Sequence, residues 1–268
     1  MYTKHPYKRD VIGTPEIISQ VTREDIMNYY QTFYSPENMT TIIVGDFDSK
    51  EILEKVEKEF EFKDRQNSPQ KNNEIDNPVT STTIVNNTGN INTSYIMYGW
   101  LGPKACDLKN TICLDLISII FGDGTSSRLY QNLIEKQADP VFNLINCEHY
   151  QFKDGNNFFI QGNFKPEKQE LARKLIEEEL AGLLNKPITE AELQKAKKKT
   201  KSRFAYSAET VSEIGETIGY YMTVCADLKL IEDYLIDLDS ITIEDLNETI
   251  RSYLSLDNAV ISILTPES

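Results

Sequence analysis

Residues Thr22–Asp46 read TREDIMNYYQTFYSPENMTTIIVGD, and residues Thr242–Pro266 read TIEDLNETIRSYLSLDNAVISILTP. The two stretches align without a gap at a constant offset of 220 residues. Identical pairs include Thr22 with Thr242, Glu24 with Glu244, Asp25 with Asp245, Ser35 with Ser255, Asn38 with Asn258 and Ile43 with Ile263. Because the period is almost as long as the chain of 268 residues, the repeat indicates a duplicated domain, in which the end of a first copy precedes a second copy.

Each copy of the repeat predicts a helix followed by a strand. In the first copy, Thr22 has the position of an N-cap, and Asp25 follows three residues later as in a capping box. An apolar stripe at helical spacing comes next, formed by Ile26, Tyr29, Tyr30 and Phe33. Ser35-Pro36 ends the helix, because a residue before proline avoids the helical region. The β-rich segment Met39 to Val44 is then the expected strand.

The rest of the chain predicts the boundaries of the two copies. Residues 63–80 are polar and contain prolines and several asparagines, which is typical of a linker. We therefore expect residues 1–62 to be the tail of the first repeat and residues 81–268 to be a complete second repeat. Within the second repeat we expect strands at 82–85, 93–100, 143–152 and 157–164, helices at 107–121, 126–136 and 166–185, and further helices capped by Thr189 with Glu192 and Thr210 with Glu213.

The net charge excludes some classes of partner. With 28 basic and 42 acidic residues, the formal charge is −14 and the pI is near 4.7. Phosphate contacts need a basic surface, so we expect neither nucleic acid nor an anionic membrane as a partner. The one basic run, Lys195 to Lys201, is interpreted as a solvated helix face. No apolar run reaches the roughly 18 residues of a membrane span, no targeting segment is visible in the first 20 residues, and the compartment is left open.

The four cysteines, at positions 106, 113, 147 and 225, form no Cys-x-x-Cys pair. This spacing argues against a thiol-rich zinc site. We expect all four to be reduced and buried.

Three motifs resemble the pitrilysin/insulinase family of zinc metallopeptidases. They are HPYKRDVIGT (5–14), FYSPENMTTIIVGDFD (33–48) and FGDGTSSRLYQNLIEK (121–136). The first two are similar to the end of the family's catalytic domain, and the third is similar to the middle of its second, non-catalytic domain. The resemblance implies an α+β fold, with an antiparallel-dominated sheet covered by helices in each repeat. It also implies that such domains close around a chamber for an unfolded peptide, which binds by adding a strand to a sheet edge.

The resemblance also implies where the zinc site belongs. In this family an inverted His-x-x-Glu-His helix and a downstream Glu form the site, and both lie upstream of the HPY motif. This chain contains only His5 and His149, and neither belongs to such a motif. We therefore expect no catalytic residue and no metal ligand in this chain, and zinc only in an upstream domain. His5 is interpreted as structural or solvent-exposed, and His149 as a surface strand residue.

The family's second domain often contributes an Arg and, seven residues later, a Tyr that hold the substrate backbone. Ile134 and Val141 stand at the matching positions, and neither side chain can donate a hydrogen bond. Arg128 and Phe142 remain as weak substrate-binding candidates, with structural pairing as the alternative for Arg128.

Two functions follow from this resemblance. The chain is either the non-catalytic C-terminal portion of a zinc-dependent peptidase, which forms part of a peptide-binding chamber, or an inactive relative that serves as a scaffold or assembly subunit. The expected partners are a catalytic upstream domain or a homologous subunit, and peptide substrates. Because the segment Met39 to Val44 would present an unpaired strand edge, we also expect self-association, with the strand paired either across a homodimer or against the second repeat.

Overall fold

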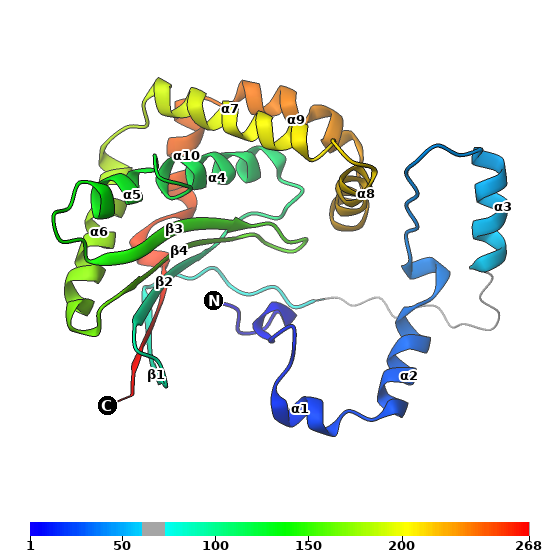
Figure 1. Cartoon of the computed structure of the whole chain (residues 1–268), viewed down its shortest axis with the longest axis horizontal. Helices are drawn as coiled ribbons and strands as arrows, with labels where there is room; N and C mark the ends of the chain where they lie inside the picture. The colour runs from blue at the N-terminus through cyan, green and yellow to red at the C-terminus, as the bar shows by residue number, and fades with distance from the viewer. Residues whose placement is uncertain (61–72, 268) are drawn as a thin grey trace. The chain divides into compact units, whose positions relative to one another are not determined.

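The structure is a computed structural model that describes residues 1–60 and 73–267 (Figure 1). The chain divides into two compact units. The sheet unit comprises Met1, Asn77–Tyr206 and Asp227–Ser268, and the N-terminal unit comprises Tyr2–Asp76 and Ser207–Ala226. Most of the predicted linker, residues 63–72, lies outside the described residues. The division into repeats at residues 62 and 81 stays a prediction, and the compact units differ from it in grouping 207–226 with the N-terminal residues.

The sheet unit contains a five-stranded sheet with the strand order β1-β5-β2-β4-β3. Its strands are β1 (Thr83–Gly89), β2 (Ser94–Leu101), β3 (Phe142–Tyr150), β4 (Asn157–Phe164) and β5 (Val260–Pro266). Only β1 and β5 pair in parallel, and the other three pairings are antiparallel. The predicted α+β class with an antiparallel-dominated sheet is therefore confirmed.

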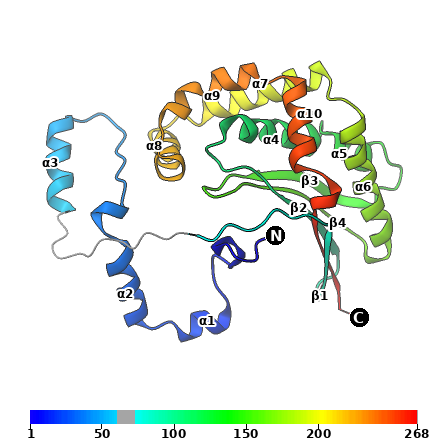
Figure 2. The same ribbon diagram turned by 180° about the vertical axis from the view of Figure 1, so that it is seen from behind.

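Helices cover one face of this sheet (Figures 1 and 2). They are α4 (Leu108–Phe121), α5 (Arg128–Tyr130), the π-helix η3 (Gln131–Glu135), η4 (Pro166–Lys168), α6 (Gln169–Asn185), α7 (Glu190–Tyr206), α9 (Lys229–Ser240), α10 (Ile243–Tyr253) and η6 (Leu256–Asn258). Helix α4 is apolar on nearly all sides, because it lies between the sheet and the outer helices α7 and α9. The expected N-cap boxes at Thr189 and Thr210 are both present, and Thr242 forms a further box with Asp245.

Buried and exposed side chains alternate along β2, and this alternation distinguishes the two faces of the sheet. Ile96, Tyr98 and Trp100 are buried against the helices, whereas Tyr95 and Met97 are exposed on the other side. This follows from the strand geometry, in which successive side chains point to opposite faces. We call the second side the open face, and its exposed apolar residues are Val85, Tyr95, Met97, Leu144 and Tyr150.

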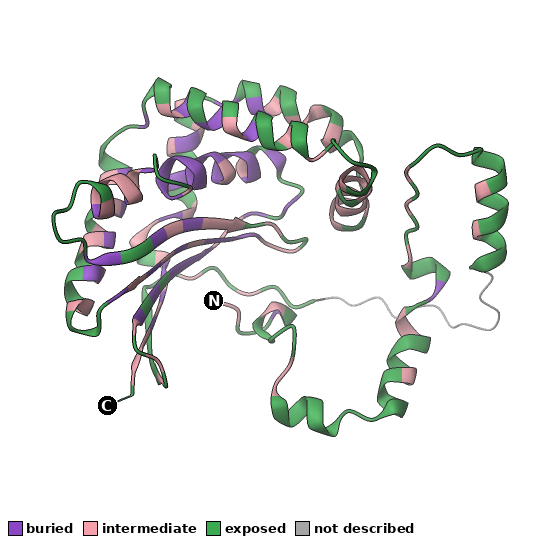
Figure 3. Cartoon of the chain, in the orientation of Figure 1, coloured by how far each residue is buried: buried purple, intermediate pink, exposed green. Residues whose placement is uncertain are grey.

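The N-terminal unit is built from short helices with little buried surface. They are η1 (Pro6–Lys8), α1 (Pro15–Gln20), α2 (Arg23–Phe33), η2 (Pro36–Asn38), α3 (Ser49–Glu59), α8 (Val211–Tyr220) and the π-helix η5 (Tyr221–Cys225). Helices α1, α2 and α3 contain no buried residue, and Figure 3 shows exposed residues along all three. Their apolar stripes therefore lack a core within this unit.

The prediction of a strand over residues 39–44 is wrong, because the structure has no strand in this segment. Its counterpart in the second copy, β5, lies between β1 and β2. The first copy has the sequence of a strand but no neighbouring strands among residues 1–60 and 73–267 with which to form a ladder.

Candidate functional site

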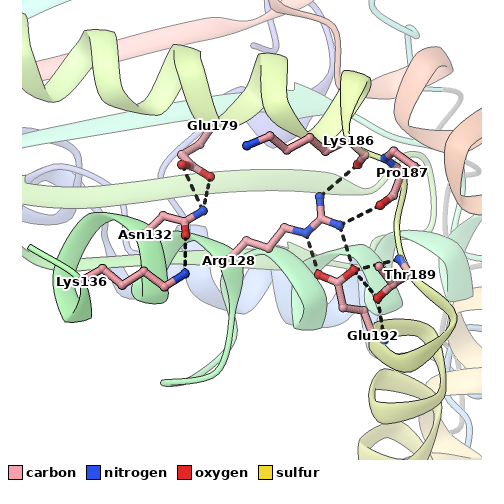
Figure 4. A network of polar contacts seen from close by, with 8 residues as sticks. All are labelled: Arg128, Asn132, Lys136, Glu179, Lys186, Pro187, Thr189 and Glu192. Atoms are coloured by element: carbon pink, nitrogen blue, oxygen red, sulfur yellow. Dashed lines mark hydrogen bonds and ion pairs between the residues drawn. The ribbon is translucent and has the colours of Figure 1, made fainter.

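Arg128, the first residue of α5, joins α5 to the connection between α6 and α7 (Figure 4). Its Nε and Nη2 donate to the two carboxylate oxygens of Glu192, at 2.7 and 2.9 Å. Its Nη1 and Nη2 also donate to the carbonyl oxygens of Lys186 and Pro187, both at 3.2 Å. The Arg128 guanidinium thus donates four hydrogen bonds within the protein, which leaves it little donor capacity for a ligand. A peptide ligand would have to displace these contacts.

Glu192 is also the N3 residue of a capping box at the start of α7. Its Oε2 accepts hydrogen bonds from the backbone N–H of Thr189 at 2.9 Å and from the Thr189 hydroxyl at 2.8 Å. The hydrogen bond from Arg128 is the main cause that lowers the pKa of Glu192 to about 2, and the Thr189 donors add to it. The carboxylate is therefore held in its charged form, as a structural ion pair requires.

The other positions singled out from the resemblance lie in the core. Phe142 is buried at the start of β3 and makes an edge-to-face contact with Phe164, at 6.0 Å between ring centroids. Val141 is buried and Ile134 is packed against the same core. Substrate binding by Arg128 and Phe142 stays a prediction, and the contacts of both residues are those of structural side chains.

His149 does not lie on the surface, so that prediction was wrong. Its side chain is only 1% exposed, and its Nδ1 lies 2.6 Å from Oδ1 of Asp115 on α4. Asp115 also accepts a hydrogen bond from Gln151 at 2.9 Å. His149 shares the helix-covered face of β3 with the buried Ile145 and Cys147, and this alternation in the sequence was the signal that could have placed it inside.

His5 lies in the N-terminal unit and is buried. Its Nδ1 accepts a hydrogen bond from the backbone N–H of Tyr7 at 3.2 Å, and the two rings lie 4.0 Å apart between centroids. Asp76 accepts hydrogen bonds from the backbone N–H groups of Thr3, Lys4 and His5. These contacts give His5 a structural role, in agreement with one of its two interpretations.

The basic run on α7 is only partly the solvated face that was predicted. Lys197 is buried, and its ammonium group donates to the carbonyl oxygens of Asp239 at 2.9 Å and Ile241 at 2.6 Å. It thereby satisfies carbonyl groups at the C-terminus of α9. Lys199 and Arg203 form ion pairs with Asp123, at 3.0 and 2.6 Å.

None of the four cysteines is in a disulfide, but they are not all buried as predicted. Cys106 is exposed and Cys225 is half-buried, whereas Cys113 and Cys147 are buried. Burial raises the pKa of Cys113 to about 11 and holds the pKa of Cys147 well above its usual value.

Over residues 1–60 and 73–267, we find no group of three or more His, Cys, Asp or Glu side chains that could hold a metal ion. In the same part of the chain, every helix is too short or too polar to cross a bilayer.

Residues 20–200 match the family described as "Peptidase M16 inactive domain". The chain belongs to the M16 peptidase family. This confirms the resemblance to zinc metallopeptidases of the pitrilysin/insulinase type, and the matched domain is a non-catalytic one.

Individual M16 relatives agree with this membership. The chain is 27% identical to the zinc protease PqqE of Helicobacter pylori over 99% of the chain and 60% of that protein. A crystal structure of a protease from Helicobacter pylori superposes with a TM-score of 0.88 at 26% identity, over 99% of this chain and 64% of that one. The chain is also 20% identical, over 92% of its length and 56% of the relative, to the probable inactive metalloprotease YmfF of Bacillus subtilis. The chain thus spans about 60% of the length of the Helicobacter protein.

Proposed function

We propose that the chain is the non-catalytic C-terminal portion of a zinc-dependent peptidase, and that it forms part of the wall of a peptide-binding chamber. Its match to the inactive M16 domain carries this proposal. The Arg128 network supports it, because that arginine stabilises the α5–α6–α7 corner instead of offering a free catalytic or substrate-binding group. Zinc and the general base would come from a catalytic-type unit.

The difference in burial between matching residues of the two repeat copies supports a catalytic-type unit as the partner. Leu246 in α10 is fully buried, whereas the matching Ile26 in α2 is 58% exposed. Ile263 in β5 is 2% exposed, whereas the matching Ile43 is 41% exposed. Burying an aliphatic side chain of this size stabilises a protein by about 1.5–3 kcal/mol. The first copy therefore offers an apolar surface that a catalytic-type unit would cover with a sheet and helices of its own.

A second function has its own support. Ile134 and Val141 lack the hydrogen-bond donors expected of a substrate-holding Arg and Tyr, and both are packed in or against the core. A scaffold or assembly subunit has no need of these donors. One of the relatives is itself described as a probable inactive metalloprotease.

The two functions are separated by reconstitution. We expect the chain alone to keep no stoichiometric zinc after dialysis against a mild chelator, and to leave a fluorogenic peptide uncleaved. Adding the catalytic-type unit of the parent protein in trans should then produce cleavage that a strong chelator abolishes. The control is the same unit with Gln in place of the Glu of its His-x-x-Glu-His motif. A parent unit without that motif, or a complex without turnover, would favour the scaffold; zinc-dependent cleavage by the chain alone would contradict both proposals.

Self-association of the isolated chain is expected through the segment 39–44. Its backbone belongs to no strand ladder and its Ile43 side chain is exposed, which favours pairing with a second copy. Light scattering at rising concentration should show a dimer, and Ile43→Lys should return the chain to a monomer. Lys174→Glu, on the exposed surface of α6, is the matched control and should leave the dimer intact. A chain that stays monomeric at every concentration would contradict this prediction.

A further inference from the structure

The loop that contains the HPY motif directs four hydrogen-bond donors to one carboxylate. The backbone N–H and the hydroxyl of Thr3 both donate to Oδ1 of Asp76, each at 2.6 Å. The backbone N–H of Lys4 donates to the same oxygen at 2.9 Å, and that of His5 donates to Oδ2 at 2.8 Å. Successive backbone N–H groups that converge on one anion form a nest. We call these four donors of Thr3, Lys4 and His5 the nest.

The nest is distinct from the N-terminus of η1. That short helix begins at Pro6, which has no N–H group, and its next N–H group, on Tyr7, donates to Nδ1 of His5. The nest donors all precede the helix, and their acceptor is Asp76. The arrangement is therefore a property of the loop at residues 3–5.

This loop is held in shape by contacts of its own. The ammonium group of Lys8 donates to the carbonyl oxygen of Thr3 at 2.8 Å, and the backbone N–H of Lys8 donates to that of His5 at 3.1 Å. The ring of the buried His5 lies 4.0 Å from the ring of Tyr7 and 5.8 Å from that of Tyr2, between centroids. Because none of these contacts involves Asp76, they orient the donors independently of the carboxylate.

The donors match a charged carboxylate and not a neutral amide. A carboxylate only accepts hydrogen bonds, and both oxygens of Asp76 do so here. Partial burial opposes the charge, but the hydrogen bonds from the Thr3 hydroxyl and from the three backbone N–H groups outweigh it, so the pKa of Asp76 lies well below its usual value. Hydrogen bonds to a charged acceptor are also about twice as strong as neutral ones.

The contact also has a particular place in the chain. Tyr2 and Asp76 are the two ends of the first segment of the N-terminal unit, whereas Met1 and Asn77 belong to the sheet unit. The nest therefore joins the two places at which the chain passes from one unit to the other. It closes the segment Tyr2–Asp76 into a loop.

We propose that the nest is a carboxylate-binding site with Asp76 as its built-in ligand, and that this contact is a latch that holds the two ends of the segment Tyr2–Asp76 together. In a chain without the Asp76 carboxylate, the same site binds a free carboxylate. This inference does not depend on whether the chain lines a peptide chamber or serves as a scaffold.

The latch is tested with Asp76→Asn in the full chain. This variant keeps the shape of the side chain but replaces one acceptor oxygen with an NH₂ group, so at least one nest donor loses its acceptor. We expect the amide protons of Lys4 and His5 to exchange with solvent at least about tenfold faster, as measured by NMR. Asp139→Asn is the matched control, because that carboxylate is 86% exposed and pairs with Lys168. It should leave both exchange rates unchanged.

The binding site is tested with Asp76→Ala, which empties the nest. Sodium formate, the smallest carboxylate, should slow the exchange of the Lys4 and His5 amides again and shift their resonances in a saturable manner. Sodium chloride at the same ionic strength controls for screening and should leave exchange fast. The wild-type chain, whose nest is filled, should not respond to formate.

Each outcome decides the proposal. Unchanged exchange in Asp76→Asn would overturn the latch. An Asp76→Ala chain that keeps its helical circular dichroism but does not respond to formate would overturn the binding site, because Asp76 itself would then arrange the donors. If Asp76→Ala loses helical content, recovery of that content in formate supports the proposal, and a lack of recovery overturns it.

Discussion

Replacing Gly122 with alanine is expected to destabilise the sheet unit strongly. Gly122 follows α4, and a Cβ atom at this position would lie 2.2 Å from the backbone nitrogen of Cys147 on β3 and 2.6 Å from its Sγ. The first of these atoms belongs to a strand in the sheet and cannot rotate away. Overpacking of well-packed cores costs about 1–3 kcal/mol, and a clash with backbone exceeds that range. This is a large fraction of a total stability of about 5–15 kcal/mol.

Gly182→Ala is the matched control for that substitution. Gly182 lies inside α6, and a Cβ atom there would have no neighbour within 4 Å. Alanine in a helix interior should therefore stabilise the chain by about 0.5–1 kcal/mol. Urea unfolding followed by circular dichroism measures both variants. Similar midpoints for the two variants would mean that α4 and β3 are not packed as closely as the structure shows.

Arg128→Ala is expected to have the next largest effect, a loss of about 2–3 kcal/mol in the free energy of unfolding. The substitution removes four hydrogen bonds and leaves Glu192 charged and only partly exposed. The side chains of Arg128 and Glu192 are 17% and 30% exposed, so solvent screens the pair and keeps the cost below that of a fully buried one.

Arg251→Ala is the control for Arg128. The Arg251–Glu244 pair has a similar contact distance of 2.6 Å, but its side chains are 59% and 67% exposed. Its loss should change stability by less than about 1 kcal/mol. If Arg128 instead serves a bound peptide, Arg128→Ala will leave Tm unchanged and weaken peptide binding in the reconstituted complex.

The same ion pair predicts a dependence of stability on pH. The pKa of Glu192 is lowered from 4.5 to about 2 in the folded chain, first by the hydrogen bond from Arg128. A carboxylate with a lowered folded pKa stabilises the protein above its unfolded pKa, and this contribution is lost as pH falls toward the folded value. Tm should therefore fall between about pH 4.5 and pH 2, and Arg128→Ala should make this decline shallower. Parallel Tm curves for the two chains would contradict this assignment.

Features that depend on nearby residues could be predicted from the sequence. The capping boxes at Thr22, Thr189 and Thr210 join groups three residues apart, and the structure confirms each of them. The helix over residues 107–121, which is α4 in the structure, was predicted for the same local reason. The repeat and the three motifs led to the family, because they preserve order and spacing along the chain.

Contacts between distant parts of the chain could not be predicted. The sequence predicted a surface position for His149, because no pattern near it identifies Asp115, 34 residues away on α4, as its partner. Lys197 was assigned to a solvated face because the carbonyl groups it satisfies lie 42 and 44 residues further along. The sequence leaves both a ligand and a structural role open for Arg128, because Glu192, which accepts its hydrogen bonds, lies 64 residues away.

Comparison of the two copies of the repeat separates what the sequence alone determined, the helix, from what the tertiary structure decided, the strand. The local pattern specified a capped helix in both copies, since the hydrogen bonds of a helix and its cap lie within one segment. It did not specify a strand, since a strand satisfies its backbone groups through neighbours from elsewhere in the chain. Residues 260–266 have β1 and β2 on either side and form β5, whereas residues 39–44, with matching sequence, are described without strand structure.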